Sequence, residues 1–553
     1  MVQDYAHERV IHDLLERQAK KYGSRTYMYS DDREYSFEEV NLIASKVACG
    51  LQKLGVVKGD KVAVVMDSTI EVIFLLFGLS KLGAVEVTIN TSHKGDVMAY
   101  MVDHSDAKIL IMHSHYIDRL KPVLETTKNI HSVVIMDGDE EDKKKFDRDI
   151  SPAALKKEIA PYIERTIEWF ELVVNDGAYQ PAEVIFSDPL LLLYTSGTTG
   201  ISKGVVLPQN LMYNMADRFD NFVLEDALTE DDCIYVPTPL FHAHSWHSGI
   251  NLALLKGASI YLVKKFSASR YWDDVKRHNC KYSTGGGARL PILLLAPPTP
   301  ADADNPLEVI IGGPASAKLC SEFEPRFGVK IMEFYGSTEL AAPISNAVSD
   351  KNRKPGTCGK IHPDCIVKFV DDYGVEVPQG EDGEMLFRML KPYTMLLEYY
   401  KMPDKSMECF SDLWFHTGDR AHLDKDGFVC FADRKKDSIR RRGENISSFE
   451  VERAINAHPA VLESAAYAVE SEMYDDEVMV SLTFKAGQSV KPEDLLAFCQ
   501  ERMAYFMVPR YLRFMDALPK NGIERIEKYK LREEGITADT WDREKAGYQV
   551  KRS

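Results

Sequence analysis

The sequence has few of the features that would place a protein in a membrane or outside the cell. Its longest apolar stretch, Val72 to Leu79, is much shorter than the roughly 20 residues that a membrane-spanning helix needs. The first residues contain no basic segment followed by an apolar core, so we expect no secretory signal. The nine cysteines are odd in number and include no Cys-x-x-Cys pair, which favours a reducing compartment. We therefore expect a cytoplasmic protein without an integral membrane segment.

Positive charge is also scarce. The chain has 68 lysines and arginines against 85 aspartates and glutamates, a net charge of −17. Such a balance argues against non-specific binding of nucleic acid or anionic membranes, so an anionic ligand must meet a local positive site. Internal repeats, low-complexity segments and a Gly-x-Ser-x-Gly nucleophile elbow are absent from the sequence. At 553 residues the chain is too long for one core, and two or more domains are expected.

Strand and helix patterns alternate at the start of the chain. Helical periodicity covers residues 8–22, 36–54, 71–82 and 94–104, and apolar β-branched runs cover 61–66, 85–89 and 107–112. Ser36 and Glu39 fit a capping box. This alternation predicts parallel strands with helices on both faces. Beyond about residue 436 a smaller unit is predicted, with helices at 447–457 and 492–505 and strands at 465–469 and 478–484.

Two other segments have competing interpretations. Residues 137–149 form a charge run, which we interpret as a solvated loop rather than a docking site. His242, His244 and His247 raise the alternative of a metal centre, because histidine is a common zinc ligand. No His-x-x-Glu-His pattern or acidic companion follows them. Packing in the core or lining of a substrate pocket is therefore favoured.

A polar turn between two apolar runs is the most informative stretch. Residues 194–205 are Tyr-Thr-Ser-Gly-Thr-Thr-Gly-Ile-Ser-Lys-Gly-Val, which predicts strand, turn and strand. The turn contributes Thr195, Ser196, Gly197, Thr198, Thr199, Gly200 and Lys203. Glycines let backbone N–H groups approach an anion, and hydroxyls and the lysine add donors, so we predict a polyphosphate clamp. It is not a Walker A loop, since Ser202 precedes the lysine and no helix pattern follows; the alternative is a plain surface turn.

The order of these residues resembles the signature of the adenylate-forming superfamily, which includes acyl-CoA synthetases, peptide adenylation domains and luciferases. A second matching segment, Ile-Met-Glu-Phe-Tyr-Gly-Ser-Thr-Glu, occupies residues 331–339. The resemblance implies that Tyr335, followed by Gly336 and Ser337, stacks on adenine, that Thr338 binds the α-phosphate, and that Glu339 holds Mg²⁺ together with Thr198. An aromatic face, a hydroxyl and a hard oxygen ligand suit these roles. Gly313, Pro314 and Ala315 resemble the segment against the adenine face.

The resemblance also marks an acyl pocket. Residues 239–242, Pro-Leu-Phe-His, are similar to the segment that abuts the acyl carboxylate, which assigns that contact to His242. His244, Ser245 and Gly286 are expected to line or back the pocket. Arg289 is unusual in a region that is apolar in related enzymes. It either pairs with a carboxylate of the substrate or points to solvent, and we favour solvent.

The remaining matches concern the ribose and a C-terminal lid. Asp419 and Arg434 correspond to ribose contacts, Lys436 to a hinge, and Gly443 to a loop against the pantetheine arm of CoA. We expect the basic patch at 435–442 to attract phosphates. The resemblance divides the chain into an adenylation domain at 1–435 and a lid domain at 436–553.

Two positions depart from the pattern of the superfamily. Arg525 stands where the lid has its catalytic lysine; arginine keeps the charge but has a planar, longer fork, so we expect it to carry adenylation. Lys528 and Lys520 are the alternatives. Ser202 replaces the usual proline before Lys203, which removes a restraint on φ from the turn.

The resemblance extends from about residue 10 to 535 and looks closest to the carnitine/crotonobetaine-CoA ligase branch. It implies an α/β fold: parallel α/β subdomains plus a distorted β-barrel, followed by a small mobile α+β lid. The implied enzyme is an ATP-dependent acyl-CoA ligase that uses ATP, Mg²⁺ and coenzyme A, forms acyl-AMP and pyrophosphate, and then makes acyl-CoA. No nucleic-acid partner is expected, and a homodimer is left open. The alternatives are an adenylate-forming amide synthetase and a non-catalytic nucleotide-binding relative.

Overall fold

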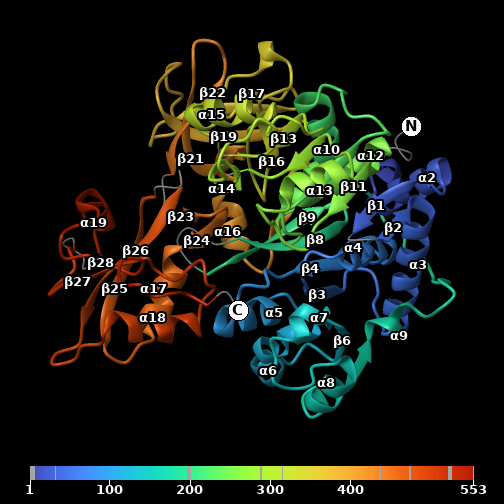
Figure 1. The fold of residues 1–553 in the computed structure, drawn as a ribbon, viewed down its shortest axis with the longest axis horizontal. Helices are drawn as coiled ribbons and strands as arrows, with labels where there is room; N and C mark the ends of the chain where they lie inside the picture. Colours follow the sequence, from blue (N-terminus) through green and yellow to red (C-terminus); the bar gives the residue numbers. More distant parts are fainter. Residues whose placement is uncertain are drawn as a thin grey trace. The chain divides into compact units, whose positions relative to one another are not determined.

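The computed structural model describes residues 6–30, 33–195, 201–286, 289–313, 315–434, 438–471, 475–520 and 526–551, with only the backbone at 433, 434, 438 and 445. The chain forms two compact units (Figure 1). Unit 1 comprises residues 1–91, 102–194 and 204–433, and unit 2 comprises 92–101, 195–203 and 434–553.

The largest sheet of the described chain has eight strands in the order β20-β9-β8-β4-β3-β5-β6-β7. Its strands are β3 (Lys61–Val65), β4 (Val85–Thr88), β5 (Ile109–His113), β6 (Ser132–Met136), β7 (Arg165–Glu168), β8 (Pro189–Thr195), β9 (Lys203–Pro208) and β20 (Glu398–Tyr399). From β8 to β7 every neighbouring pair is parallel, whereas β20 pairs antiparallel with β9. All four residues of β4 and all five of β5 are buried, as expected for strands covered on both faces.

A second sheet has seven strands in the order β14-β13-β12-β10-β11-β1-β2. Its strands are β1 (Thr26–Ser30), β2 (Arg33–Ser36), β10 (Cys233–Val236), β11 (Ser259–Leu262), β12 (Tyr282–Thr284), β13 (Val309–Ile311) and β14 (Lys330–Met332). Its pairs are parallel except for the β1–β2 pair. The predicted parallel α/β class is confirmed.

Antiparallel strands follow these two sheets. One sheet has the order β15-β16-β17 and the other β18-β19-β21-β22. Their strands are β15 (Phe334–Ser337), β16 (Ala341–Ser345), β17 (Lys360–Ile361), β18 (Cys365–Val370), β19 (Gly383–Met389), β21 (Phe415–Leu423) and β22 (Val429–Arg434). These short sheets supply the curved, non-parallel part that the resemblance implied.

The helices of the first 433 residues include those predicted from periodicity. They are α2 (Ile11–Tyr22), α3 (Phe37–Lys53), α4 (Ile70–Leu82), α5 (Gly95–His104), α6 (Ile117–Thr126), α7 (Glu140–Lys143), α8 (Pro152–Ile159), α9 (Trp169–Val173), α10 (Gln209–Arg218), α11 (Ala243–Ser245), α12 (Asn251–Lys256), α13 (Tyr271–Arg277), α14 (Arg289–Leu294), α15 (Ala317–Phe327) and α16 (Pro403–Glu408). The capping box at Ser36 and Glu39 is confirmed, since each side chain bonds the backbone of the other residue. Helices α3 and α4 pack against each other (Figure 1).

The C-terminal part of unit 2 is a separate α+β structure with its own apolar core. It contains the hairpin β23 (Ser438–Arg441) and β24 (Glu444–Ser447), and a sheet in the order β25-β26-β27-β28. That sheet is built from β25 (Val461–Glu470), β26 (Asp476–Phe484), β27 (Tyr511–Phe514) and β28 (Trp541–Asp542), with helices α17 (Ser448–Asn456), α18 (Pro492–Gln500) and α19 (Lys528–Glu534). The two predicted helices and the two predicted strands are confirmed, as α17, α18, β25 and β26.

The helices within the described residues were searched for membrane spans. None of them is both long enough and apolar enough to cross a bilayer.

A buried ion pair ties α10 to the start of β18. Arg218, 1% exposed, donates from Nε to both carboxylate oxygens of Asp364, at 3.2 and 2.9 Å, and from an Nη atom at 3.1 Å. Burial raises the pKa of Asp364, but the Arg218 guanidinium outweighs that effect and holds the pKa below its ordinary value. Asn214 adds a further donor at 3.3 Å. The pair therefore satisfies two charges that would otherwise be costly to bury.

Removing one partner of this pair should be strongly destabilising. In Arg218→Met the Asp364 carboxylate stays buried without its counter-ion, and we expect a loss of about 3–5 kcal/mol in the free energy of unfolding. Thermal unfolding of the two proteins measures the change. Lys405→Met, which breaks the exposed pair with Glu408, is the matched control and should cost less than about 1 kcal/mol. Equal melting temperatures for both variants would contradict this assignment.

Candidate functional site

The predicted clamp lies between β8 and β9. Thr195 is the last residue of β8 and Lys203 the first of β9, so the two predicted strands are confirmed. Ser196, Gly197, Thr198, Thr199 and Gly200 lie outside the described residues. The assignment of the phosphate contacts, and of Thr198 as a metal ligand, therefore remains a prediction.

The serine before the clamp lysine has a defined set of partners within unit 2. Ser202 is 1% exposed and donates from its backbone N–H, at 3.2 Å, and from its hydroxyl to the same carboxylate oxygen, Oε1 of Glu450. Its carbonyl accepts the hydroxyl of Tyr100 at 3.1 Å. Ser202 thus replaces the fixed φ of proline with side-chain hydrogen bonds. Glu450 was not expected from the sequence, because it lies 248 residues away.

Glycines allow two loops of unit 1 to lie almost in contact. A Cβ on Gly286 would sit 2.6 Å from the backbone of Gly312 and Gly313, and one on Gly313 would sit 2.7 Å from Cγ of Glu333. The loops follow β12 and β13, neighbouring parallel strands whose carboxyl ends share one edge of the sheet. Ala315 is buried, and Pro314 lies outside the described residues. Gly286 thus serves the approach of two backbones; its predicted place in the pocket wall stays a prediction.

The residues predicted to bind adenine and ribose are brought together by two strands. Tyr335 on β15 donates its hydroxyl to Oδ2 of Asp419 on β21, at 2.8 Å. Both residues are mostly buried, with 7% exposure each. Gly336 is required by its surroundings, since a Cβ there would lie 1.9 Å from the carbonyl oxygen of Ala341. The two predicted ligand residues, 84 positions apart, are therefore neighbours.

Glu339 has a partner that the motif did not indicate. Ser337 ends β15, and Thr338 and Glu339 form the turn before β16. The hydroxyl of Tyr399 donates to Oε1 of Glu339 at 2.8 Å. Burial raises the pKa of Tyr399, and the Glu339 carboxylate raises it further, so the phenol stays a donor. No periodicity links the two residues; their contact depends on the pairing of β20 with β9, where Tyr399 lies opposite Val205.

Removing the Tyr335 hydroxyl tests whether Asp419 is oriented for the ribose. In Tyr335→Phe the aromatic face remains, but the buried carboxylate loses one donor, which typically costs about 1 kcal/mol. We expect the KM for ATP to rise roughly five-fold with a smaller change in kcat. Steady-state kinetics at varied ATP measure both constants. The control is Tyr373→Phe, at a side chain that is 93% exposed. An unchanged KM for ATP in Tyr335→Phe would contradict the assignment of Asp419 to the ribose site.

The histidine segment divides into partly exposed and buried residues. His242 is partly exposed, while Nε2 of His244 lies 3.0 Å from the carbonyl oxygen of Ile311. Ser245 is fully buried and donates to the carbonyls of Thr238 and Pro239, both at 2.9 Å. His244 and Ser245 thus hold the local backbone, and Ser245 backs this region rather than exposing a hydroxyl. Among the described residues these histidines do not form a metal-ligand cluster.

Arg289 is neither fully buried nor fully solvated. It opens α14, and its guanidinium carbon lies 5.8 Å from the centre of the Phe266 ring. The side chain has intermediate exposure. Contact with an aromatic face is a common arrangement for arginine. The choice between a substrate carboxylate and solvent stays a prediction.

His247 lies in the core, and its ionisation is linked to stability. The residue is 3% exposed, and its ring nitrogens have no hydrogen-bond partner among the described residues. Burial, with smaller contributions from His244 and Arg218, lowers its pKa to about 3 from 6.5. Because the unfolded state takes up a proton below pH 6.5 and the folded state does not, the stability contributed by neutral His247 is lost as pH falls from 6.5 towards 3.

This linkage can be measured by comparison with His247→Leu. At pH 5 the protonation of the unfolded state should weaken the wild type by about 2 kcal/mol relative to neutral pH, a penalty that the leucine variant lacks. The difference in melting temperature between the two proteins, measured at pH 7.5 and at pH 5, should therefore shift in favour of the variant. The control is His131→Leu, at a partly exposed position. If the melting temperatures of the wild type and His247→Leu differed by the same amount at pH 7.5 and at pH 5, the assignment of a neutral, buried His247 would be contradicted.

The lid residues are only partly within the described chain. Lys436 and Arg525 lie outside it, as does the side chain of Arg434. Gly443 has φ of 85° in the β23–β24 turn, after Arg442 with φ of 53°, so the turn itself favours glycine.

The prediction that the basic residues at 435–442 attract phosphates is wrong for Arg441. Arg441 is 2% exposed, and its Nε lies 2.7 Å from a carboxylate oxygen of Glu477. A buried, paired guanidinium cannot attract phosphates at the surface. Side chains alternate between the two faces of β23, and this alternation directs the Arg441 side chain towards the core.

The two lysines considered as alternatives to Arg525 are engaged in ion pairs. Nζ of Lys528 lies 2.7 Å from Glu452, and Nζ of Lys520 lies 2.9 Å from Glu463.

Comparison with known proteins places the chain in a family. The family model described as "AMP-binding enzyme" matches residues 15–400, and the model of the "AMP-binding enzyme C-terminal domain" matches residues 450–525. The crotonobetaine/carnitine–CoA ligase of Salmonella typhi is 28% identical over 527 residues, covering 93% of this chain and 97% of the relative. That agreement extends over nearly the whole length of both proteins.

Solved structures agree with the family match. The anthranilate CoA ligase AuaEII, in complex with anthranoyl-AMP, has a TM-score of 0.67 at 26% identity and covers 95% of this chain and 96% of its own. The o-succinylbenzoate CoA synthetase of Bacillus subtilis has a TM-score of 0.79 at 24% identity, with 96% and 99% covered, and shows the same fold. With the matched motifs, these similarities identify the chain as a member of the AMP-binding enzyme family and an adenylate-forming acyl-CoA ligase.

Proposed function

We propose that Tyr335, Asp419 and Glu339 form the nucleotide end of the active site. The observation that carries the proposal is the pair of contacts from Tyr335 to Asp419 and from Tyr399 to Glu339, each at 2.8 Å. Tyr335 offers its ring to adenine, and Asp419 accepts hydrogen bonds from the ribose hydroxyls. Gly313 and Ala315 lie against the adenine face, and Thr338 binds the α-phosphate. The resemblance of residues 331–339 to the superfamily motif supports these roles.

Glu339 is the proposed ligand of Mg²⁺. A carboxylate oxygen is the hard donor that this ion prefers, and the hydroxyl-rich clamp, with Thr198 as a second ligand, provides donors of the same kind. Bound Mg²⁺ would supply charge neutralisation to the phosphates. Tyr399 fixes Glu339 by hydrogen bonding one oxygen. Lys203 adds positive charge beside the pyrophosphate in this proposal.

The acid and the lid complete the proposal. His242 contacts the carboxylate of the acid, and Arg525 bridges that carboxylate and the α-phosphate while an acyl-adenylate forms and pyrophosphate leaves. The lid domain, residues 436–553, then turns about Lys436, and Gly443 faces the pantetheine arm as CoA displaces AMP. The ion pairs of Lys528 and Lys520 support Arg525 over these lysines.

We further propose that the acid is short and polar or charged. His242 and His244 lie in the segment assigned to the acyl pocket. The name of the Salmonella typhi relative includes crotonobetaine and carnitine, which are acids of this type. A reducing, cytoplasmic location is also proposed, since the nine cysteines are free thiols. Even the neighbouring Cys280 and Cys233 form no disulfide, and Sγ of Cys280 donates a hydrogen bond to Sγ of Cys233 at 3.4 Å. A homodimer can be tested by the mass of the purified protein in solution.

Exchange of labelled pyrophosphate into ATP tests the role of Arg525. We expect Arg525→Ala to lower acid-dependent exchange by roughly 10²–10³-fold, the loss typical of a missing preorganised donor. Arg525→Lys should retain most of it. The control is Arg165→Ala, at an exposed residue of β7. Unchanged exchange in Arg525→Ala would show that another cation carries the step.

A panel of acids separates the wider alternatives. AMP release with CoA and short, medium, aromatic, dicarboxylic or betaine-type acids identifies the substrate class, and we expect activity with a short polar acid. AMP release with an amine in the absence of CoA would instead support an amide synthetase. No exchange with any acid would support a non-catalytic relative.

A further inference from the structure

Outside the nucleotide site, the fold brings two histidines and an aspartate together. Asp67 follows β3, and His113 ends β5. These strands are parallel neighbours with Val65 opposite Met112, so Asp67 and His113 leave the sheet at the same edge. His115 lies two residues further on, in the 3-10 turn η1 (Ser114–Tyr116). The His-x-His pair thus bends back over Asp67.

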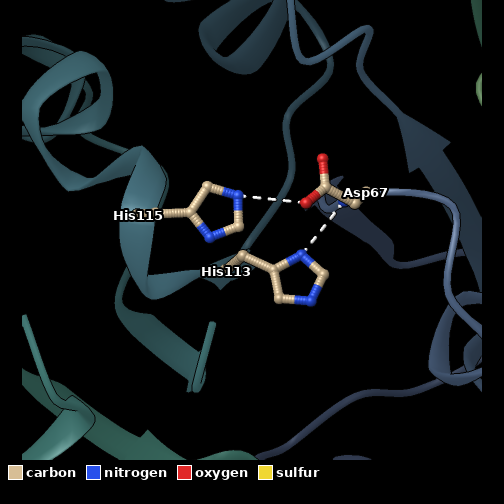
Figure 2. Close-up of side chains that lie close together, drawn as sticks. All are labelled: Asp67, His113 and His115. Atoms are coloured by element: carbon tan, nitrogen blue, oxygen red, sulfur yellow. Dashed lines mark hydrogen bonds and ion pairs between the residues drawn. The ribbon is translucent and has the colours of Figure 1, made fainter. Parts of the chain in front are cut away.

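The side chains converge on one small volume. Nε2 of His115 lies 3.0 Å from Oδ2 of Asp67, and Nδ1 of His113 accepts the backbone N–H of Asp67 at 3.0 Å (Figure 2). The two imidazole rings are stacked, with centroids 5.2 Å apart and planes at 18°. One ligand atom from each residue lies within 4.8 Å of the other two. Figure 2 shows both rings turned towards the Asp67 carboxylate and backbone.

The surroundings of His115 resemble those of a metal ligand. Its side chain is 9% exposed, and Nδ1 has no hydrogen-bond partner among the described residues, although Oδ2 of Asp142 lies 3.7 Å away. Metal-binding histidines usually direct their second nitrogen at a carboxylate, which fixes the ring. Asp142 stands in that position. The other Asp67 oxygen, Oδ1, accepts the hydroxyl of Tyr116 and is held in place.

Acidic and basic side chains alternate around Asp67, His113 and His115. Asp67, Asp139 and Asp142 surround Lys264, whose Nζ lies 3.4 Å from Oδ2 of Asp67 and 2.6 Å from Asp139. Lys145 adds one more ammonium, 2.7 Å from Asp142. Three carboxylates thus face two ammonium groups and the guanidinium of Arg119, which interacts with Asp67. Asp139 and Asp142 belong to the charge run at 137–149, so the interpretation of that run as a solvated loop is wrong for Asp142, which is 8% exposed.

We propose that Asp67, His113 and His115 bind a divalent transition-metal ion of the zinc class. Two imidazoles and one carboxylate are a ligand set for Zn²⁺ and similar ions rather than for Mg²⁺, which prefers oxygen ligands alone. The ligand atoms are Nε2 of His115, Oδ2 of Asp67 and Nδ1 of His113, which gives up the backbone N–H of Asp67 when the ion binds. Because zinc bonds are about 2.0–2.2 Å long, the side chains close around the ion by small rotations. Lys264 competes for the same carboxylate and limits the affinity.

Titration with ZnCl₂ tests the site. Full-length protein without an affinity tag is first stripped of metal with EDTA, and the EDTA is removed before the titration. We expect His115→Gln and His113→Gln to bind Zn²⁺ at this site at least ten-fold more weakly than the wild type. His131→Gln, at a partly exposed histidine of the same unit, should bind as the wild type does. Lys264→Met should bind more tightly because it removes the competing ammonium. Equal Zn²⁺ binding by the wild type and both cluster variants would overturn the proposal, as would weaker binding in Lys264→Met.

Two further readouts separate this site from other metal binding and from misfolding. The visible spectrum of added Co²⁺ should show nitrogen and oxygen ligation that is lost in His115→Gln, whereas MgCl₂ should not compete for it. Pyrophosphate exchange and circular dichroism show that each variant is folded. A Co²⁺ spectrum that persists in a folded His113→Gln, His115→Gln double variant would overturn the assignment.

Discussion

The antiparallel pairing of β20 with β9 is the interaction on which the proposed nucleotide site depends. Glu398 lies opposite Val206 and Tyr399 opposite Val205, and the N–H of Tyr400 donates to the carbonyl of Gly204 at 2.8 Å. Side chains alternate between the faces of a strand, so a slip of one residue would replace Tyr399 by its neighbour. The backbone register thereby decides which hydroxyl reaches Glu339. The strand that leaves the clamp and the carboxylate proposed for Mg²⁺ are joined by this one pairing.

Local features could be predicted from the sequence, because their causes are local. The capping box at Ser36, the buried β4 and β5, and helices α17 and α18 follow from residues a few positions apart. The motif at 331–339 lies on β14 and β15 and on the turn that follows them. The partners of the motif residues could not be predicted in this way. Tyr399 lies 60 residues from Glu339, and Asp419 lies 84 from Tyr335, so only the topology brings them together.

Charged residues were the least predictable part of the chain. Arg441 and Asp142 both sit in runs that look solvated, yet each is almost fully buried. Composition cannot show this, since a charge enters the interior only where a distant residue compensates it. Glu477 does so for Arg441, and Lys264 does so for Asp142. The same rule explains Arg218, whose partner Asp364 is 146 residues away.

The bonds between Ser202 and Glu450 have a consequence for how such sequences diverge. Proline, the residue that the resemblance places before the lysine, has neither the N–H nor the hydroxyl that Glu450 accepts. A change from Ser202 to proline alone would leave a carboxylate that is 6% exposed without both of these donors. The two positions are therefore constrained to change together. In an alignment of relatives, serine at one and glutamate at the other should covary, although 248 residues separate them.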